Sequence, residues 1–581
     1  MDSRDIRQPR IEKEIRAEYF GMRPEAENNA EMFANALAFC RENNINRLYI
    51  EPGVYHFTIT QSFCLDGMQD FELYAPGVRF VFYSPIRNTE QIIFFRLERC
   101  DTVKITGLMV DWDVNKAPLA SLVRAECITA EYVDFRCMED RDIPDRALFV
   151  SLNAVNPVTF TPGVEGGLEY NVDGNQRESF QRRERIGEKR YRCYFKPEKP
   201  GIGILREGGY YLVRHYMYNG GVFLIQECKN IVFEDLSIYG APGSGFDARR
   251  YCSHFYFHRV HITLPPYERR YITTTVDGVF LAGTDGYMLF EDCDFGYQGD
   301  DGINIHDCVY SGASAVEGKA NVIALNAVFK KGEILTFTNM DLSPAGYTAE
   351  IVEAEQVDGG YRYTLSMDVP KVVVERTVIY NMSRNSSNFE IRRCRFHENR
   401  ARGILVHADD GRIEDCEFYH TQGAAIQIET GISSAWSEGR GVKNLVIRNN
   451  RMIGCDVNDW NRGVIYMSNY TMEGIPIKNS DYPNPTSTVS DSEAVFRSPF
   501  PVFKNITIED NCLEEYPRRA MILTSFEGLT LRNNILRNRC ARSHENPDRG
   551  SILIEYGTGL TEEHNVFEPS PYMLMPCIEQ R

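Results

Sequence analysis

Three aspartates in one short stretch of the chain have the side chains and the spacing for acid–base chemistry. Asp277 opens an apolar segment, and the pair Asp300 and Asp301 follows 23 and 24 residues later, between Gly299 and Gly302. Carboxyl groups held close together cannot all ionise without repelling one another, so at least one pKa should be raised. A proton donor and a carboxylate on opposite sides of a sugar are what the hydrolysis of a glycosidic bond requires. The three aspartates therefore predict a catalytic site.

A sequence repeat of similar length surrounds the aspartates. Each unit has an apolar strand, a turn with Cys or Asp-Gly, and a second strand of alternating polarity; units of this kind occupy residues 92–112, 221–240, 245–263 and 278–296. Cys228 and Cys252 take the same place in successive units, and the pattern resumes beyond the middle of the chain. Short strands with Asn, Asp or Gly turns every 22–24 residues are typical of a right-handed parallel β-helix. A large β-sandwich is the alternative, but its strands do not recur in a stacked register.

Two stretches interrupt the repeat. Residues 114–216 and 312–382 alternate hydrophobic and polar residues around Gly and Asp turns, which predicts inserted antiparallel domains. The flanking segments are then 20–113 (cap and first coils), 217–311 (the coils with the aspartates) and 383–568 (the C-terminal coils). We thus expect an all-β chain, a right-handed parallel β-helix with two inserted small antiparallel β-barrel domains and an N-terminal capping helix.

The capping helix is expected at residues 27–46. Its apolar stripe has the i, i+3, i+4 spacing and consists of Met32, Phe33, Ala36, Leu37 and Cys40. A helix in this place would cover the first coil, whose open edge would otherwise invite aggregation. A further excursion, residues 475–501, is rich in Pro, Ser and Asp and is expected to be a long surface loop.

Polar residues outside the aspartate group are candidates for binding a sugar. Asn304 and His306 are two positions apart, so in a strand they face the same way. They could bind sugar hydroxyls or serve only as a structural Asn and a surface His, and the residues leave both roles open. The same two roles stay open for Trp436, as a platform for a sugar, and for Glu438, as a clamp for hydroxyls.

Other acidic residues are expected to shape turns. Asp-Asp and Asp-Gly are ordinary turn pairs, and Asp409 and Asp410 have no acidic partner one repeat away. Asp113 lies in an acid–aromatic cluster with Asp111 and Trp112, just before the first interruption. A turn role is favoured for this cluster, and a role for Asp113 in binding part of the substrate stays open.

The aspartate pattern resembles known families. A lone Asp followed about one coil later by Gly-Asp-Asp is similar to inverting β-helix glycosidases, polygalacturonases included. The resemblance is closer to glycoside hydrolase family 110, the α-1,3-galactosidases, in which Asp-Asp is followed by Asn-x-His, as in DDGINIH here, and in which a segment similar to AWSEGRGVKNLVIRNN occurs later. The chain departs from that family at Gly302 and Asp307, where another small residue and a Gly are expected. The Gly-His-Gly and Arg-x-Lys signatures of polygalacturonases are absent from suitable places.

The resemblance implies an inverting exo-hydrolase that removes a terminal α-linked galactose, α-1,3-linked, from an oligosaccharide or glycan. Asp300 would be the general acid, and Asp277 and Asp301 would position and activate the water. No metal and no cofactor are expected. Two alternatives remain: another β-helix glycosidase, such as a polygalacturonase-like enzyme, and a non-catalytic β-helix that binds carbohydrate.

The charge and composition of the chain limit the kinds of molecule that it is expected to bind. The formal net charge of −18 disfavours nucleic acid and polyanionic glycans, whereas a neutral sugar is compatible with it. No apolar run approaches the ~20 residues that span a bilayer, so no membrane is expected. The N-terminus lacks the apolar core of a signal peptide, so the protein is expected to be cytoplasmic, or exported with its signal removed. The 16 cysteines are expected to be small buried hydrophobes rather than disulfides. A homodimer is compatible with these features.

Overall fold

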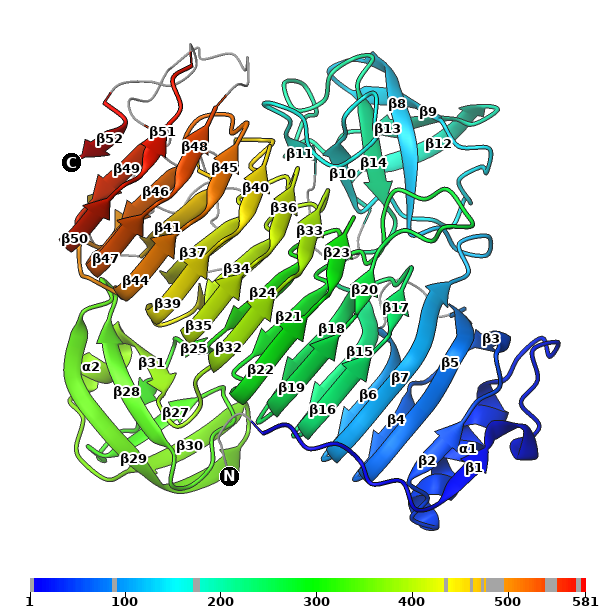
Figure 1. Ribbon diagram of the computed structural model, residues 1–581, viewed down its shortest axis with the longest axis horizontal. Helices are drawn as coiled ribbons and strands as arrows, with labels where there is room; N and C mark the ends of the chain where they lie inside the picture. Colours follow the sequence, from blue (N-terminus) through cyan, green and yellow to red (C-terminus); the bar gives the residue numbers. More distant parts are fainter. Residues whose placement is uncertain are drawn as a thin grey trace.

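The computed structural model shows a β-helix from which two smaller sheets project (Figure 1). It describes residues 5–85, 91–170, 178–432, 437–459, 463–471, 475–476, 496–538, 551–570 and 576–581. The predicted fold class is confirmed: the chain is a right-handed parallel β-helix with two antiparallel inserts and a helix over its first coil. None of the helices in these residues is long and apolar enough to cross a membrane.

One face of the β-helix is a thirteen-stranded sheet whose strands are parallel except for β38. Its strands are β4 (Phe63–Asp66), β6 (Ile92–Glu98), β15 (Gly220–Gln226), β18 (Ser244–Arg249), β21 (Val279–Ala282), β24 (Ile303–His306), β34 (Ile404–His407), β37 (Ile426–Ile432), β38 (Ser437–Glu438), β41 (Ile465–Tyr470), β46 (Met521–Thr524), β49 (Ile552–Glu555) and β52 (Ile578–Gln580). Along these strands aliphatic residues that point into the interior alternate with residues that face outward, as the period of two in a strand requires.

The other strands of the coils form a 23-stranded sheet. They are β1 (Glu14–Arg16), β2 (Arg47–Tyr49), β3 (Gly53–Thr58), β5 (Gln69–Tyr83), β7 (Asp101–Trp112), β16 (Lys229–Glu234), β17 (Ser237–Ile238), β19 (Ser253–His258), β20 (His261–Ile262), β22 (Asp285–Glu291), β23 (Asp294–Gly296), β32 (Ser387–Arg392), β33 (Arg395–His397), β35 (Asp409–Glu414), β36 (Glu417–Tyr419), β39 (Val442–Arg448), β40 (Arg451–Ile453), β44 (Phe503–Glu509), β45 (Cys512–Glu514), β47 (Phe526–Arg532), β48 (Ile535–Arg537), β50 (Thr558–Glu563) and β51 (Val566–Phe567). Within successive coils a single left-handed residue ends one strand of this sheet before the next begins, for example Asp235, Asp292 and Asp415, with φ of 52°, 54° and 57°. Asp and Asn tolerate this conformation better than most residues, which explains the recurring acidic turn of the repeat.

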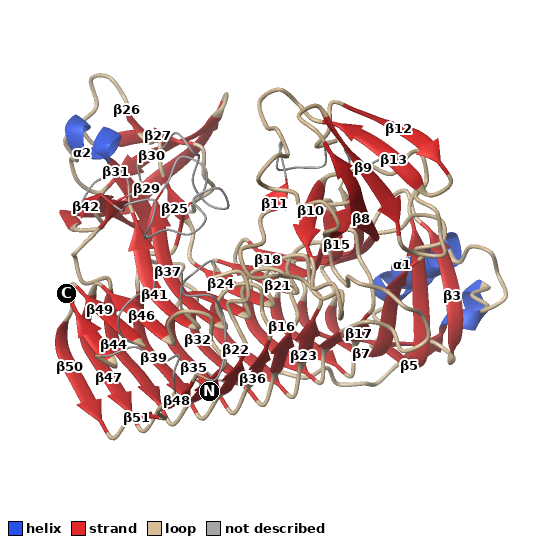
Figure 2. Cartoon of the chain, turned by 90° about the horizontal axis from the view of Figure 1, so that it is seen from above, coloured by secondary structure: helices blue, strands red, loops and turns tan. Residues whose placement is uncertain are grey.

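Two antiparallel sheets of seven strands are inserted into the coils. The first insert contains β8 (Ala120–Ile128), β9 (Tyr132–Cys137), β10 (Ser151–Ala154), β11 (Glu169–Tyr170), β12 (Arg182–Gly187), β13 (Arg190–Tyr194) and β14 (Tyr210–Arg214). The second contains β25 (Val309–Tyr310), β26 (Ser314–Ala315), β27 (Val322–Leu325), β28 (Ile334–Asn339), β29 (Pro344–Val357), β30 (Gly360–Leu365), β31 (Thr377–Asn381) and helix α2 (Lys371–Arg376). Both rise from the same side of the β-helix, with β18, β21 and β24 between them (Figure 2).

The N-terminal cap is shorter than predicted. A 3-10 helix, η1 (Ala17–Phe20), precedes α1 (Ala30–Glu42), and Phe33, Ala36, Leu37 and Cys40 of the predicted stripe are buried whereas Met32 is half-buried. Asn28 and Asn29 lie outside the helix because their side chains bind the backbone of Ala30 and Arg23 instead. The predicted loop at 475–501 contains the short strands β42 (Ile475–Pro476) and β43 (Phe496–Arg497), and most of the rest lies outside the described residues.

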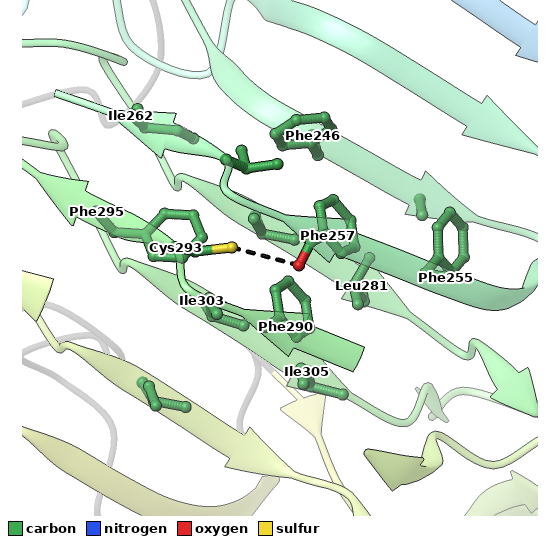
Figure 3. Packing of buried hydrophobic residues seen from close by; sticks show 14 of the residues in the cluster. Phe246, Phe255, Phe257, Ile262, Leu281, Phe290, Cys293, Phe295, Ile303 and Ile305 are labelled. Carbon is green, nitrogen blue, oxygen red and sulfur yellow. Dashed lines mark hydrogen bonds between the residues drawn. The ribbon is translucent and has the colours of Figure 1, made fainter. Parts of the chain in front are cut away.

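The interior is filled by side chains that stack from coil to coil. Phe233, Phe257 and Phe290 form one such stack, with ring centroids 5.4 and 4.5 Å apart, and Figure 3 shows the last two beside Leu281 and Ile305. Fully burying one Phe side chain stabilises a fold by about 1.5–3 kcal/mol, so the repeated stack holds neighbouring coils in register. The described cysteines are all free, as the sequence predicted, and Cys293 of the interior directs its Sγ to the Phe257 carbonyl oxygen at 3.4 Å.

Candidate active site

Asp277, Asp301 and Arg402 form one row across three neighbouring coils. β21 pairs in parallel with β24, and β24 with β34, and each of the three residues stands two positions before the first residue of its strand. The backbone continues this register, since the Gly278 N–H donates to the Asp301 carbonyl at 2.8 Å and the Gly302 N–H donates to the Arg402 carbonyl at 3.0 Å. Residues that are one repeat apart in the sequence are therefore neighbours in space, because the strands of successive coils pair in parallel register.

The three aspartates form a tight carboxyl cluster, which we call the triad. One side-chain oxygen of each of Asp277, Asp300 and Asp301 lies within 4.8 Å of the other two, and all three residues are at most 6% exposed. The Asp301 N–H also donates to Asp277 Oδ1 at 3.2 Å. This spacing is shorter than the roughly 6.5–9.5 Å that separates the two carboxyl groups of typical inverting glycosidases.

Asp300 is the triad member whose charge is best stabilised. Its Oδ1 lies 2.8 Å from Arg400 Nη1, and its Oδ2 accepts a hydrogen bond of 2.6 Å from the Tyr218 hydroxyl. Burial opposes ionisation, but Arg400, Arg402 and the Tyr218 hydroxyl outweigh it and hold the pKa of Asp300 below its ordinary value. Asp300 is therefore a carboxylate in the unliganded molecule.

Asp277 and Asp301 are the triad members whose pKa values are raised. Burial, followed by the nearby charges of Asp300 and Asp301, raises the pKa of Asp277 well above its ordinary value. Burial likewise raises the pKa of Asp301 to about 7, although Arg402 Nε at 3.0 Å from its Oδ1 acts in the opposite direction. The prediction that at least one carboxyl has a raised pKa is confirmed. The order of the pKa values, however, is opposite to the roles that the family resemblance implies, because Asp300 and not Asp277 is the ionised group.

The first insert supplies part of this site. Glu169 of β11 accepts two hydrogen bonds from Arg400, at 2.6 and 2.9 Å, so Arg400 is shared between Glu169 and Asp300. Arg214 of β14 is 1% exposed and donates from Nη1 to the carbonyl of Thr275 at 3.2 Å and to that of Gly299 at 2.8 Å. Arg214 thereby ties together the two turns that carry the aspartates.

A polar row continues along the outward face of the thirteen-stranded sheet. Asn304 and His306 of β24, His407 of β34, and Gln427 and Glu429 of β37 alternate with interior aliphatic residues and are all at most 6% exposed. The Gln427 amide donates to Glu429 Oε2 at 2.8 Å, and burial raises the pKa of Glu429 to about 8 against the opposing charge of Arg402. Within the described residues, Asn304 Oδ1 and His306 Nε2 have no hydrogen-bond partner. Buried polar atoms of this kind suit a ligand with hydroxyl groups.

The structure brings Glu438 to this row. β38 pairs with the end of β37, and Glu438 forms a backbone bridge with Cys308. Its carboxylate lies 3.8 Å from His306 Nε2 and 3.6 Å from His407 Nε2. Burial lowers the pKa of His407 to about 4, so this ring is neutral at physiological pH. Trp436, predicted as a sugar platform, lies outside the described residues.

The remaining predicted acids stand apart from the triad. Asp113 Oδ1 accepts hydrogen bonds of 3.2 Å from the backbone N–H groups of Asn115 and Lys116, which is a turn role, and none of its described contacts reaches the triad. Asp409 accepts the Lys443 N–H at 2.8 Å and pairs with Arg440. Asp113 therefore has the turn role that the sequence favoured, whereas the turn expected at Asp409 is wrong: Asp409 is the first residue of β35 and joins that strand to the segment 440–443.

Several residues of the site were not predicted. Arg402 occupies the row of Asp277 and Asp301, so laying RARGILVH under GDDGINIH would have indicated it. Glu429 could have been found in the same way from QGAAIQIE. Glu169 and Tyr218 carry no such signal, because they belong to segments without the repeat.

The triad oxygens are close enough to surround a cation. Positive charge is already present, however, because Arg400 and Arg402 contact Asp300 and Asp301. The two guanidinium groups therefore offset part of the negative charge of the triad.

Comparison with known proteins agrees with the fold. The family model described as "Right handed beta helix region" matches residues 335–493 and 382–572. Alpha-1,3-galactosidase A of Shewanella woodyi is 23% identical over 96% of this chain and 91% of its own length. Alpha-1,3-galactosidase B of Bacteroides thetaiotaomicron is 23% identical over 89% of this chain and 85% of its own length. Among solved structures, the exopolygalacturonase of Thermotoga maritima has a TM-score of 0.45 with 13% identity, over 97% of this chain and 94% of that one.

Fold and site define a class, the right-handed β-helix proteins, here with a buried carboxyl triad in the turns that precede β21 and β24. Within it, the chain is a relative of the α-1,3-galactosidases, which confirms the family resemblance seen in the aspartate motif.

Proposed function

We propose that the protein is a glycoside hydrolase that removes a terminal α-1,3-linked galactose from a neutral glycan. The observation that carries the proposal is the triad, in which neighbouring buried carboxyls have pKa values moved in opposite directions. Such a division of pKa values supplies a proton donor and a carboxylate in one site. The relationship to α-1,3-galactosidases over nearly the whole chain supports galactose as the sugar and the 1,3 linkage.

In the proposed reaction Asp300 protonates the glycosidic oxygen, and Asp277 and Asp301 hold the attacking water. One of the two carboxylates takes a proton from the water as its oxygen bonds to C1 of galactose. The bond from C1 to the leaving oxygen breaks, and the leaving sugar departs with the proton from Asp300. The triad takes one proton from the water and gives one to the leaving sugar, so its proton count is unchanged and a transfer between its members restores the starting state.

Substrate binding has to redistribute the proton of the unliganded site. Asp277 carries it there, whereas Asp300 is ionised. Titrating groups this close share their protons as a unit, so transfer from Asp277 to Asp300 is a rearrangement within the cluster. Neutralising Asp300 also removes the like charge that helps to raise the pKa of Asp277 and Asp301. One transfer therefore creates the acid and the base together.

Inversion is proposed from the family resemblance, since the triad spacing by itself does not favour it. Proton NMR of the first product tests it. An α-galactoside should release galactose that is initially β-configured, whereas initially α-configured galactose would exclude inversion.

Removal of the general acid should affect substrates according to their leaving group. We expect Asp300→Asn to lower kcat/KM for an α-1,3-linked digalactoside by roughly 10²–10⁴-fold. α-Galactosyl fluoride should be affected far less, because fluoride leaves without a full proton transfer. Asp277→Asn and Asp301→Asn should impair both substrates, because both need the activated water. Asp410→Asn, an exposed aspartate outside the site, is the matched control.

Three outcomes would contradict these assignments. If Asp277→Asn shows the dependence on leaving group, Asp277 is the acid. If the wild type releases product from oligogalacturonate and none from the digalactoside, the enzyme is of the polygalacturonase type. If it binds glycans with equal affinity before and after Asp300→Asn and cleaves none, it is a carbohydrate-binding protein.

A further inference from the structure

The outward face of the thirteen-stranded sheet changes in exposure at the triad. Towards the C-terminal coils the outward side chains are buried: Gln427, Tyr466, Ile522 and Leu553, in successive coils, are 4–7% exposed. Towards the N-terminal coils, the outward side chains of β18 and β21 are more accessible. Phe280 and Asp247 are half-buried, and the Arg249 side chain is 50% exposed.

The three more accessible residues, Asp247, Arg249 and Phe280, lie on the strands beside Asn304 and His306. Asp247, Phe280 and Asn304 are partners in the parallel register of β18, β21 and β24. The residues beside them, such as Phe246, Ala248 and Val279, belong to the interior, so Asp247, Phe280 and Arg249 face outward. Phe280 belongs to β21, the strand that begins two residues after Asp277. Its ring centroid is 4.8 Å from that of His306.

We propose that Phe280, Asp247 and Arg249 bind the sugar that leaves, so that the glycan enters over β18 and β21 and its terminal galactose lies over Asn304, His306 and the buried side chains beyond. This inference rests on the proposed function. An enzyme that removes a terminal sugar has one side of the scissile bond enclosed and the other open to the rest of the glycan. The exposure of the sheet assigns the enclosed side to β34 and β37 and the open side to β18 and β21.

The chemistry of the open residues fits a neutral pyranose. The C–H face of such a ring is apolar and packs on an aromatic face, while its hydroxyls need donors and acceptors at the edge. Arg249 lies over Phe280, with its guanidinium carbon 4.8 Å from the ring centroid, and its Nε donates to Asp247 Oδ1 at 2.5 Å. Arg249 has to move aside for a sugar to stack on Phe280, and the sugar then meets an apolar surface with a donor, Arg249, and an acceptor, Asp247, at its border.

The test compares two substrates that share galactose and differ in the leaving group. The α-1,3-linked digalactoside has a leaving sugar, and α-galactosyl fluoride has none. The readout is the ratio of kcat/KM for the digalactoside to kcat/KM for the fluoride. We expect Phe280→Ala to lower this ratio roughly tenfold, since the stacked aromatic contact with the leaving sugar is lost.

Further variants make the result specific. Phe280→Tyr keeps the ring and should retain the wild-type ratio. Asp247→Asn removes the charge that orients Arg249 and should lower the ratio less than Phe280→Ala does. Tyr19→Ala, which removes a 75% exposed aromatic ring from the N-terminal cap, is the control and should leave the ratio unchanged.

The outcomes separate this inference from the proposed function. If the wild type hydrolyses both substrates and neither Phe280→Ala nor Asp247→Asn changes the ratio, the leaving sugar does not bind at these residues. An increase in the ratio with Phe280→Ala would also overturn the proposal. If the wild type hydrolyses neither substrate, the proposed function itself fails.

Discussion

At the residue scale, the behaviour of the site follows from where protons are held. Asp300 is ionised because Arg400 and Tyr218 contact its two oxygens, and Asp277 is protonated because it is buried beside that charge. The same reasoning applies to Glu429, one of the buried outward residues, whose pKa is raised to about 8 mainly by burial. Such a group binds a proton more tightly in the folded protein than in the unfolded chain.

Glu429 should make stability depend on pH. Because the folded-state pKa is raised from 4.5 to about 8, its contribution is fully present below pH 4.5 and is lost as the pH rises to about 8. Glu429→Gln cannot ionise, so its Tm should fall less than that of the wild type between pH 5 and pH 9. Differential scanning calorimetry at the two pH values measures this difference. Glu353→Gln, at an exposed position of β29, is the control, and an equal fall in wild type and Glu429→Gln would refute the prediction.

At the scale of elements, the first insert is part of the active site. It leaves the coils ahead of β15, returns Arg214 to the turns that precede β21 and β24, and places Glu169 against Arg400 ahead of β34. Arg400 divides its hydrogen bonds between Glu169 and Asp300, so the insert weakens the hold of Arg400 on the Asp300 carboxylate. The insert therefore influences the ionisation of the proposed acid without providing a reacting group.

Glu169→Gln should shift the pH profile of the enzyme. Without the Glu169 charge, Arg400 has only Asp300 as a carboxylate partner and stabilises its charge more strongly. The pKa of Asp300 therefore falls further. The protonated acid is then lost at lower pH, so the alkaline limb of kcat/KM for the digalactoside should move to lower pH. Glu184→Gln, an exposed carboxylate of the same insert, should leave the profile in place. A uniform loss of activity at every pH would instead indicate that Glu169 only maintains the structure.

At the scale of the whole molecule, the β-helix is a series of coils that each contact mainly their neighbours. In its C-terminal half a buried ladder of amides joins Asn450, Asn511, Asn534 and Asn565. Asn511 Oδ1 accepts from both the backbone N–H and the side chain of Asn450, at 3.0 Å each. Stability in such a solenoid is close to a sum of coil and interface contributions, so damage in one coil is felt locally.

Asn511→Ala should loosen the C-terminal coils and spare the triad. The substitution leaves the buried Asn450 backbone N–H without its acceptor, at about 1–3 kcal/mol, and removes one of the two donors to Asn534 Oδ1, whose other donor is the Asn511 backbone N–H. Hydrogen exchange should therefore accelerate in β44, β47 and β50 while β21 and β24 stay protected. Thr507→Ala, an outward position of β44, serves as the control. Equal acceleration in all coils would show that the β-helix unfolds as one unit.

The sequence alone determined the β-helix, because a period of 22–24 residues can place like residues in line only if each period closes one coil. For the same reason the separation of 24 residues was enough to predict that Asp277 and Asp301 are neighbours in space. The extent of the capping helix was less well predicted, because Asn28 and Asn29 bind the backbone with their side chains.

Only the tertiary structure decided which acid is ionised. That depends on Tyr218, Glu169 and Arg400, which reach Asp300 from segments 82, 131 and 100 residues away in the chain. The repeat places Arg400 in the coil after Asp300 but does not link the segments of Tyr218 and Glu169 to it, and a pKa is set by burial and by charges at close range rather than by distance along the sequence. The open and enclosed ends of the outward face are likewise defined only by the folded molecule. The exposure of a side chain depends on the elements that pack against it, and the repeat does not specify them.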